Sequence, residues 1–173
     1  MKTFEESLQP DPRFRAFMAY DEYDQLRRME FRDHYAMVAN LDLPMGVTRT
    51  VATNWERALH CLVYAWFDYE LLIVGEGQAF AAADLALKEK LAYPPGKGPL
   101  GFAGRLKAAV ERGLVMPSTA TNGWLTTHEI LGALRNEIAH GTEHVHDPNM
   151  ASRVFDHLRA LICELYGLPI PAL

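Results

Sequence analysis

The stretch TRTVATNWERALHCLVYAWFDYE, residues 48–70, carries apolar side chains at regular intervals. They recur three or four residues apart, at Trp55, Leu59, Leu62, Val63, Trp66 and Tyr69. One face of a helix brings positions with this spacing together. The stretch therefore predicts a helix with a wide buried face.

Helical signals continue toward the C-terminus. The segment VGEGQ, residues 74–78, is expected to interrupt or kink the chain, and a further helix follows until the Pro and Gly cluster YPPGKGPLG at 93–101. The segment 102–113 predicts a short helix that Gly113 ends. Thr126 and Glu129 form a capping-box pattern at the start of the next helix, which ends at Gly141. The last helix is expected to open with Asp147 and Pro148 and to stop at Gly167.

The N-terminal part is less regular. Asp11 and Pro12 fit a helix start, and the charged stretch that follows, to about Asn40, is compatible with one long helix or two short ones. No alternating β pattern of useful length is present. We expect an all-α bundle of about four to five main helices, in a single domain over 1–173. Residues 1–45 form a helical extension and residues 48–167 the bundle.

Composition limits the possible classes of protein. The chain has 173 residues, 49% hydrophobic and 23% charged, with a net charge of −5, which is typical of a soluble globular protein and argues against a general nucleic-acid coat protein. We expect Cys61 and Cys163 to be reduced core residues. The N-terminus lacks an apolar signal core, and the run at 61–75 is interrupted by Asp68 and Glu70. We therefore expect a cytoplasmic protein that does not span a membrane.

The segment LRNEIAHG, residues 134–141, raises the question of function. On a helical wheel the core side carries Ile130, Leu131, Leu134 and Ile138. A far side consists of small residues beside Asn136: Gly132, Ala133 and Ala139. These small residues indicate a second packing face, with a dimer interface as one interpretation and simple tolerance of small residues as the other.

The polar residues of this segment suit phosphodiester chemistry. His140 lies in the last turn of its helix, where the helix dipole favours a cation, and can act as base or acid. Arg135 can hold a phosphate and stabilise developing charge, and Asn136 can orient either partner. The alternative is structural: an ion pair for Arg135, a cap for His140 and a loop contact for Asn136.

The segment resembles the signature of HEPN domains, in which Arg is followed after four to six residues by His, with a polar residue, often Asn, directly after the Arg. The resemblance extends over roughly residues 50–166. It implies a helical bundle that dimerises through facing motif helices and, in active members, metal-independent RNA cleavage by the ribose 2′-hydroxyl. Arg135 and His140 would then be catalytic, with Asn136 supporting them.

Further implications of the resemblance concern partners. Many such proteins are toxins or phage-defence effectors, so an antitoxin or other partner protein is expected beside the RNA substrate and the homodimer. Some HEPN-like domains instead serve as non-catalytic interaction or dimerisation modules, which is the alternative function.

Other candidate sites are weaker. His140, His144 and His146 are close in sequence, but we expect no metal there and no cofactor elsewhere. The segment 94–101 lacks the spacing of a phosphate-binding loop. The locally basic stretch from Lys97 to Arg112 is interpreted as a solvated helix face, with contact to a nucleic-acid backbone as the alternative. Asp68, Glu70 and Glu76 are acidic residues near an apolar helix, and one of them can approach the motif.

Overall fold

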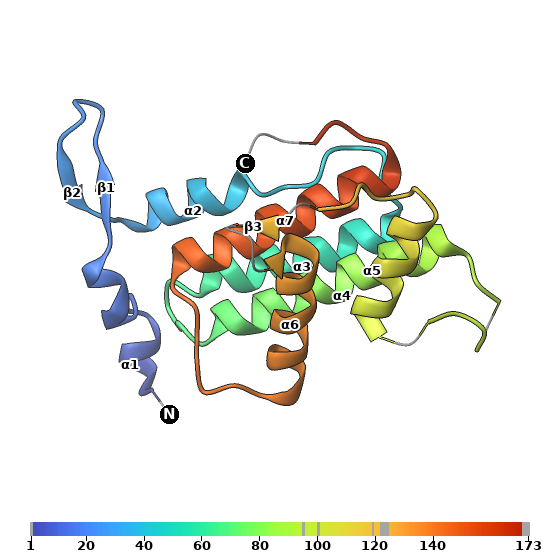
Figure 1. Cartoon of the computed structure of the whole chain (residues 1–173). Helices are drawn as coiled ribbons and strands as arrows, with labels where there is room; N and C mark the ends of the chain where they lie inside the picture. The colour runs from blue at the N-terminus through green and yellow to red at the C-terminus, as the bar shows by residue number, and fades with distance from the viewer. Residues whose placement is uncertain (1, 95, 100, 119, 122–124, 171–173) are drawn as a thin grey trace.

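The computed structural model describes residues 2–94, 96–99, 101–118, 120–121 and 125–170. Within this part, seven α-helices dominate and two short antiparallel hairpins accompany them, which confirms the mostly helical class. The bundle consists of α3 (Arg49–Tyr64), α4 (Leu71–Leu91), α5 (Gly101–Glu111), α6 (Thr127–His140) and α7 (Pro148–Tyr166). Figure 1 shows α3, α4 and α7 running along the length of the molecule, with α6 crossing them. No described helix is long and apolar enough to traverse a bilayer.

Helix α4 is the centre of the bundle, because it packs against α3, α5, α6 and α7. Gly75 lies at its crossing with α3. A Cβ atom at Gly75 would lie 2.8 Å from Leu62 Cδ1 and 3.2 Å from the carbonyl oxygen of Ala58. The expected interruption at 74–78 is therefore wrong: the chain turns earlier, between Tyr64 and Leu71, and α4 runs through both glycines of VGEGQ. The glycine at 75 permits a close approach of two helices and does not end one.

Aromatic contacts join the remaining helices to this pair. Trp55 of α3 packs edge-on against Phe155 of α7, with ring centroids 5.2 Å apart, and Phe80 of α4 does the same with Phe102 of α5 at 5.4 Å. Trp55 is thus a core residue. Cys163 is fully buried and Cys61 half-buried, and both are free thiols, as the sequence predicts.

The helix ends that the sequence predicts by local capping are confirmed. Asp147 accepts hydrogen bonds from the backbone N–H groups of Asn149 and Met150 at the start of α7. Gly167 and Gly113 have φ values of 64° and 69°, the left-handed region that favours glycine after a helix.

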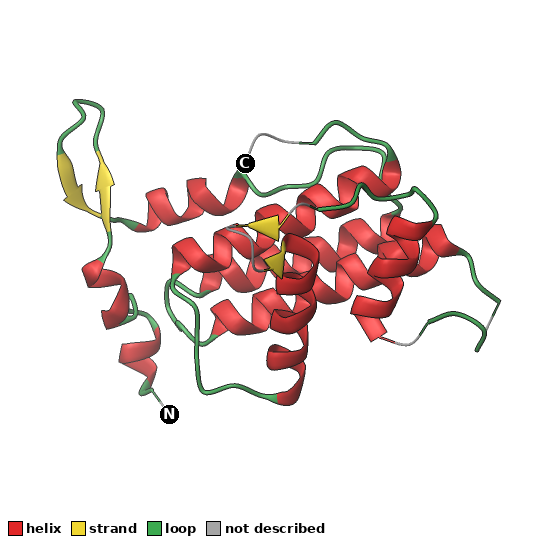
Figure 2. Ribbon diagram, in the orientation of Figure 1, coloured by secondary structure: helices red, strands yellow, loops and turns green. Residues whose placement is uncertain are grey.

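The N-terminal extension is not simply helical, which corrects the expectation for residues 1–45. It contains α1 (Phe4–Ser7), a 3₁₀ helix η1 (Pro12–Ala16), an antiparallel hairpin of β1 (Met18–Tyr20) and β2 (Leu26–Arg28), and α2 (Phe31–Ala39). The chain reverses at Asp21, whose carboxylate accepts the N–H groups of Tyr23 and Gln25. Figure 2 shows this hairpin projecting away from the bundle.

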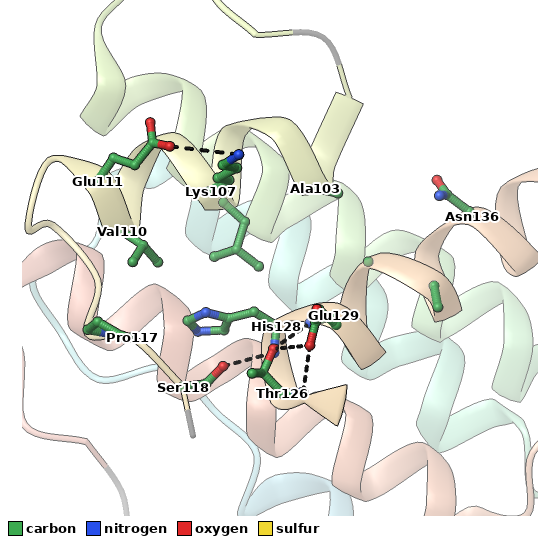
Figure 3. Close-up of a pocket in the computed structure, with 13 residues that line it drawn as sticks. Ala103, Lys107, Val110, Glu111, Pro117, Ser118, Thr126, His128, Glu129 and Asn136 are labelled. Atoms are coloured by element: carbon green, nitrogen blue, oxygen red, sulfur yellow. Dashed lines mark hydrogen bonds and ion pairs between the residues drawn. The ribbon is translucent and has the colours of Figure 1, made fainter. Parts of the chain in front are cut away.

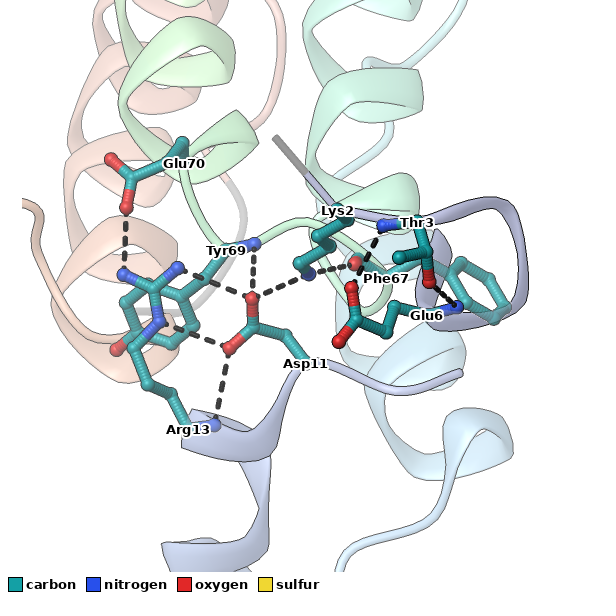
Figure 4. Close-up of polar contacts among 8 residues, drawn as sticks. All are labelled: Lys2, Thr3, Glu6, Asp11, Arg13, Phe67, Tyr69 and Glu70. Atoms are coloured by element: carbon teal, nitrogen blue, oxygen red, sulfur yellow. Dashed lines mark hydrogen bonds and ion pairs between the residues drawn. The ribbon is translucent and has the colours of Figure 1, made fainter. Parts of the chain in front are cut away.

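Asp11 fastens the extension to the turn between α3 and α4 (Figure 4). Its buried carboxylate accepts hydrogen bonds from the Tyr69 N–H, from Lys2 Nζ at 2.8 Å and from the Arg13 guanidinium at 3.0 Å. Arg13 also pairs with Glu70 and lies over the Tyr69 ring. Burial alone would raise the pKa of Asp11, but the hydrogen bonds from Arg13 and Lys2 hold it well below the ordinary 3.8.

Helix α2 is attached through buried polar groups. His34 is fully buried, and its Nε2–H donates to the Leu62 carbonyl at 2.7 Å. Burial lowers the pKa of His34, so this ring is neutral in the folded protein. Trp55 Nε1 donates to the Leu41 carbonyl, and Arg159 of α7 donates to the Asn40 carbonyl. The segment after α2 is therefore held by the core of the bundle.

We predict that Gly75→Ala destabilises the protein by about 1–3 kcal/mol, because the added methyl forces α3 and α4 apart at a fully packed crossing. Gly77→Ala is the matched control. Its Cβ would lie 3.4 Å from Ile138 Cγ2, an ordinary contact, so the helix propensity of Ala should raise stability by up to about 1 kcal/mol. Urea unfolding of both variants measures the difference. Equal effects of the two substitutions would contradict the close-crossing role of Gly75.

We also predict that Asp11→Asn lowers the free energy of unfolding by about 2 kcal/mol at pH 7, because charge-assisted hydrogen bonds are lost. The pKa of Asp11 is depressed in the folded state, so its stabilisation is present above pH 3.8 and is lost as pH falls below that value. Chemical unfolding from pH 7 to pH 3 should show the two proteins converging. Glu5→Gln, an exposed carboxylate of the same extension, serves as control and should change nothing.

Candidate functional site

Helix α6 carries the Arg135, Asn136 and His140 motif, and its two ends are set by the sequence. The Thr126 hydroxyl accepts the Glu129 N–H at 3.2 Å, and the Glu129 carboxylate accepts the Thr126 N–H at 2.8 Å. This is the predicted capping box. The helix ends at His140, and Gly141 follows with φ of 84°. His140 is thus in the last turn, as expected.

The buried face of α6 agrees with the wheel except at one position. Leu131 is buried, and Leu134 and Ile138 are half-buried against the core. Ile130, expected in the core, is 38% exposed, because it lies at the edge of the face. The contact with α4 forms where Ile138 meets Gly77.

The small-residue side of α6 is partly used within the chain. Gly132 is buried, and a Cβ there would lie 3.3 Å from the Cβ of Ala103 on α5. Gly132 therefore belongs to the second packing face that the sequence indicates, and the helix that packs there is α5 of the same chain. Ala133 and Ala139 are exposed, so the following turns of the same side are uncovered.

Arg135 is half-exposed beside α4. It lines a hollow of about 330 Å³ together with Phe80, Ala81 and Asp84. Asp84 is already bound by Arg105, through two contacts of 2.7 and 2.9 Å, and by Lys88 at 2.9 Å. Within the described residues, Arg135 has no hydrogen bond or ion pair. Its guanidinium is consequently available to an external anion.

Asn136 and His140 are exposed and stand four residues apart on the same side of α6. Around the helix axis, the side-chain directions of Asn136 and His140 differ by about 40°, whereas those of Arg135 and His140 differ by about 140°. The arc between Arg135 and His140 contains Ala139 and Asn136, which are both exposed, while Gly132, earlier in the same arc, is covered by α5. The three motif residues thus border one uncovered band, but Arg135 and His140 do not face the same hollow of one chain.

A groove of about 750 Å³ between α5 and α6 adjoins this band (Figure 3). Asn136 lies at one end, and His128 lies near Pro117 toward the other. The apolar wall includes Val110, and Lys107 and Glu111 approach each other to 4.0 Å at the rim. Partial burial lowers the pKa of His128, against the opposing effect of Glu164.

A hydrogen bond between a buried carboxylate and a histidine holds the segment that follows the motif. Glu76 of α4 is fully buried, and His146 Nδ1 lies 2.8 Å from its Oε1. The other carboxylate oxygen, Oε2, is buried without a partner among the described residues. Burial raises the pKa of Glu76, and the contact with His146 opposes that rise. The contact fastens the connection from His140 to α7 onto the central helix.

The remaining candidate sites have other roles. The described residues contain no cluster of side chains able to hold a metal ion, and His146 is used by Glu76. In the basic stretch, Arg105 is bound to Asp84, and Arg112 donates to the Leu91 carbonyl while lying over the Tyr93 ring. Arg105 is thus engaged within the chain, whereas Arg112 remains exposed despite these contacts. The sequence offered Glu76 as one of three acidic residues, with Asp68 and Glu70, and did not show which of them lies near the motif or that His146 is the partner of Glu76.

Comparison with known proteins gives no match to any protein-family model, curated protein sequence or solved structure.

We predict that His146→Ala makes stability strongly dependent on pH. Without its partner, the buried Glu76 must lose its proton alone, and its folded pKa stays above the ordinary 4.5. A raised folded pKa means that stability is present below pH 4.5 and is lost as pH rises through the folded value, by at most about 1.4 kcal/mol per pH unit. Denaturant unfolding at pH 5, 6 and 7 measures this slope.

The control is the double variant Glu76→Gln/His146→Ala, which has no carboxylate to titrate and should lose the added slope. Parallel pH profiles for wild type and His146→Ala would contradict the assigned role of the pair.

Proposed function

We propose that this protein is a metal-independent endoribonuclease of the HEPN type, in which Arg135 and His140 are catalytic and Asn136 supports them. The observation that carries the proposal is the state of the motif side chains. They border the uncovered part of α6, and Arg135 is free of partners within the described residues while its acidic neighbour Asp84 is neutralised by Arg105 and Lys88. The structural alternative for Arg135, an ion pair within the chain, has no partner among the described residues.

The chemistry follows from the properties of the two side chains. An imidazole accepts the proton of the ribose 2′-hydroxyl, whose oxygen then attacks the adjacent phosphorus. The 2′-oxygen–phosphorus bond forms, the bond from phosphorus to the 5′-oxygen breaks, and that oxygen takes up a proton. The products are a 2′,3′-cyclic phosphate and a 5′-hydroxyl. A guanidinium stabilises the negative charge on the phosphate oxygens during this step, so the reaction needs no metal ion.

A second copy of the chain completes the proposed site. Arg135 and His140 of one α6 diverge by about 140°, so a single helix does not direct both at one phosphate. Two α6 helices that face each other across their uncovered bands place Arg135 of one copy near His140 of the other. Ala133 and Ala139 are small enough to let the two helices approach. The proposed protein is accordingly a homodimer in function.

The biological setting belongs to the same proposal. An RNA-cleaving dimer of this size fits a toxin or a phage-defence effector that a partner protein or antitoxin restrains. The net charge of −5 favours contacts confined to the motif over broad binding of RNA backbone.

We predict that the purified protein cleaves RNA in EDTA and leaves 2′,3′-cyclic phosphate ends. His140→Ala should lower the rate by about 10²–10⁴-fold, and Arg135→Ala by about 10²–10³-fold, because each removes a group that acts in the transition state. Asn136→Ala should have a smaller effect. Gel analysis of labelled RNA, with end-group mapping, measures both rate and product.

The controls are His60→Ala and Arg57→Ala, which remove an exposed histidine and an exposed arginine on α3. They should leave the rate unchanged. Wild-type protein that leaves total cellular RNA and defined hairpin RNAs intact would contradict the proposal. If Arg135→Ala then alters self-association, the alternative of a non-catalytic HEPN-like interaction module would be supported instead.

A further inference from the structure

The hairpin of β1 and β2 has an apolar surface and two unpaired edges. Within the described structure it forms a sheet of two strands, and such a sheet is marginally stable in water by itself. Its exposed apolar side chains are between 45% and 74% accessible: Met18, Tyr20, Tyr23 and Leu26. The hairpin therefore leaves apolar side chains and strand edges uncovered in the described structure.

The two edges differ in charge. β2 carries Arg27 and Arg28, and charged side chains protect an edge strand from further pairing. β1 has the sequence MAY and carries no charge. The free edge of β1 is consequently the one that accepts another strand.

The backbone of β1 presents the necessary groups. Met29 N–H donates to the Phe17 carbonyl and Asp21 N–H to the Gln25 carbonyl, each at 3.0 Å. Hydrogen-bonded positions alternate along an antiparallel strand, so the backbone N–H and C=O groups of Ala19 also point toward β2. The N–H and C=O groups of Met18 and Tyr20 therefore point away from β2, and no described residue bonds to them.

We infer that β1 pairs with β1 of a second copy, in antiparallel register about a two-fold axis at Ala19. Met18 of each copy then lies opposite Tyr20 of the other and exchanges backbone hydrogen bonds with it. Ala19 meets Ala19 on the axis, at a non-hydrogen-bonded pair, where the strands are closest and a small side chain fits. Four strands form a continuous sheet whose outer edges are the charged β2 strands.

The charges flanking β1 favour β1 of a second copy as the added strand. Arg15 precedes β1 and is exposed, and Glu22 and Asp24 lie in the turn that follows it. Antiparallel pairing about Ala19 brings the start of each strand to the end of the other. The end of η1 that carries Arg15 in one copy is thereby brought toward the turn that carries Glu22 and Asp24 in its partner, at both ends of the pair. A parallel arrangement would place like charges together.

This contact is separate from the α6 contact of the proposed function and does not depend on it. The hairpin projects beyond α2, whereas the motif lies on α6 (Figure 1). Copies of the chain that are joined by both contacts form assemblies larger than a dimer. A test must therefore report on β1 alone.

The direct test is a disulfide at the axis. Non-hydrogen-bonded antiparallel pairs have Cα atoms about 4.5 Å apart, within the range that a disulfide bridges. Ala19→Cys should become a covalent dimer under mild oxidation at micromolar concentration. Gln25→Cys, exposed on the same hairpin but away from the axis, is the matched control and should remain a monomer on the same non-reducing gel, as should wild type with its two native thiols.

A charge exchange provides a second readout. Arg15→Glu and Glu22→Arg should each weaken self-association about two- to fivefold at low salt, and the double exchange should restore it, because the pair is re-formed with reversed signs. Sedimentation velocity across a concentration series measures this. Equal cross-linking of the two cysteine variants, or no rescue by the double exchange, would overturn the inference, whatever the outcome of the RNA assays.

Discussion

The close crossing of α3 and α4 at Gly75 is the constraint on which the rest of the structure depends. The two helices meet where a single Cβ would contact both a buried leucine side chain and a backbone oxygen. Along α4, half of the buried positions after Gly75 are alanines: Ala79, Ala82, Ala83 and Ala86. Small residues on several sides allow four helices to approach one central helix, and a helix that is buried nearly all round forms the core of such a bundle.

The position of the candidate site follows from this arrangement. Helix α6 reaches α4 through Ile138 and Gly77, and α5 covers its first turns at Gly132. What remains uncovered is the last part of α6, where the motif lies. The same central helix supplies Glu76, which fastens the segment after the motif through His146. The candidate site thus lies at the polar C-terminal end of α6, and the rest of α6 is held in place by its packing against α4 and α5.

Local signals in the sequence predicted the helix ends well. The capping box at Thr126 and the Asp147 cap depend on hydrogen bonds across three or fewer residues, so the sequence pattern contains the whole interaction. Gly75 was misread as an interruption because its role depends on Leu62, thirteen residues earlier, and on the other helix being present. The all-α class was predictable because helical periodicity covers most of the chain.

Long-range contacts account for what the sequence did not show. Glu76 and His146 are 70 positions apart, and their pairing follows from the path of α6 and its connection to α7. The strands of the N-terminal hairpin have three residues each, too few for alternation to be recognised. The carboxylate of Asp21 was the available signal for that turn, because Asp caps nearby N–H groups. A helical wheel predicts that another helix packs on the side of Gly132, but it cannot show that this helix is α5 of the same chain.

The central claim is that Arg135 of one copy and His140 of another act on the same phosphodiester. The most direct measurement mixes two inactive variants, Arg135→Ala and His140→Ala, after unfolding them together and refolding them. Each mixed dimer then holds one site with both side chains intact, so the account predicts that RNA cleavage returns in the mixture although neither variant cleaves alone. A mixture as inactive as its components, with mixed dimers demonstrated by mass, would contradict a site shared between two chains.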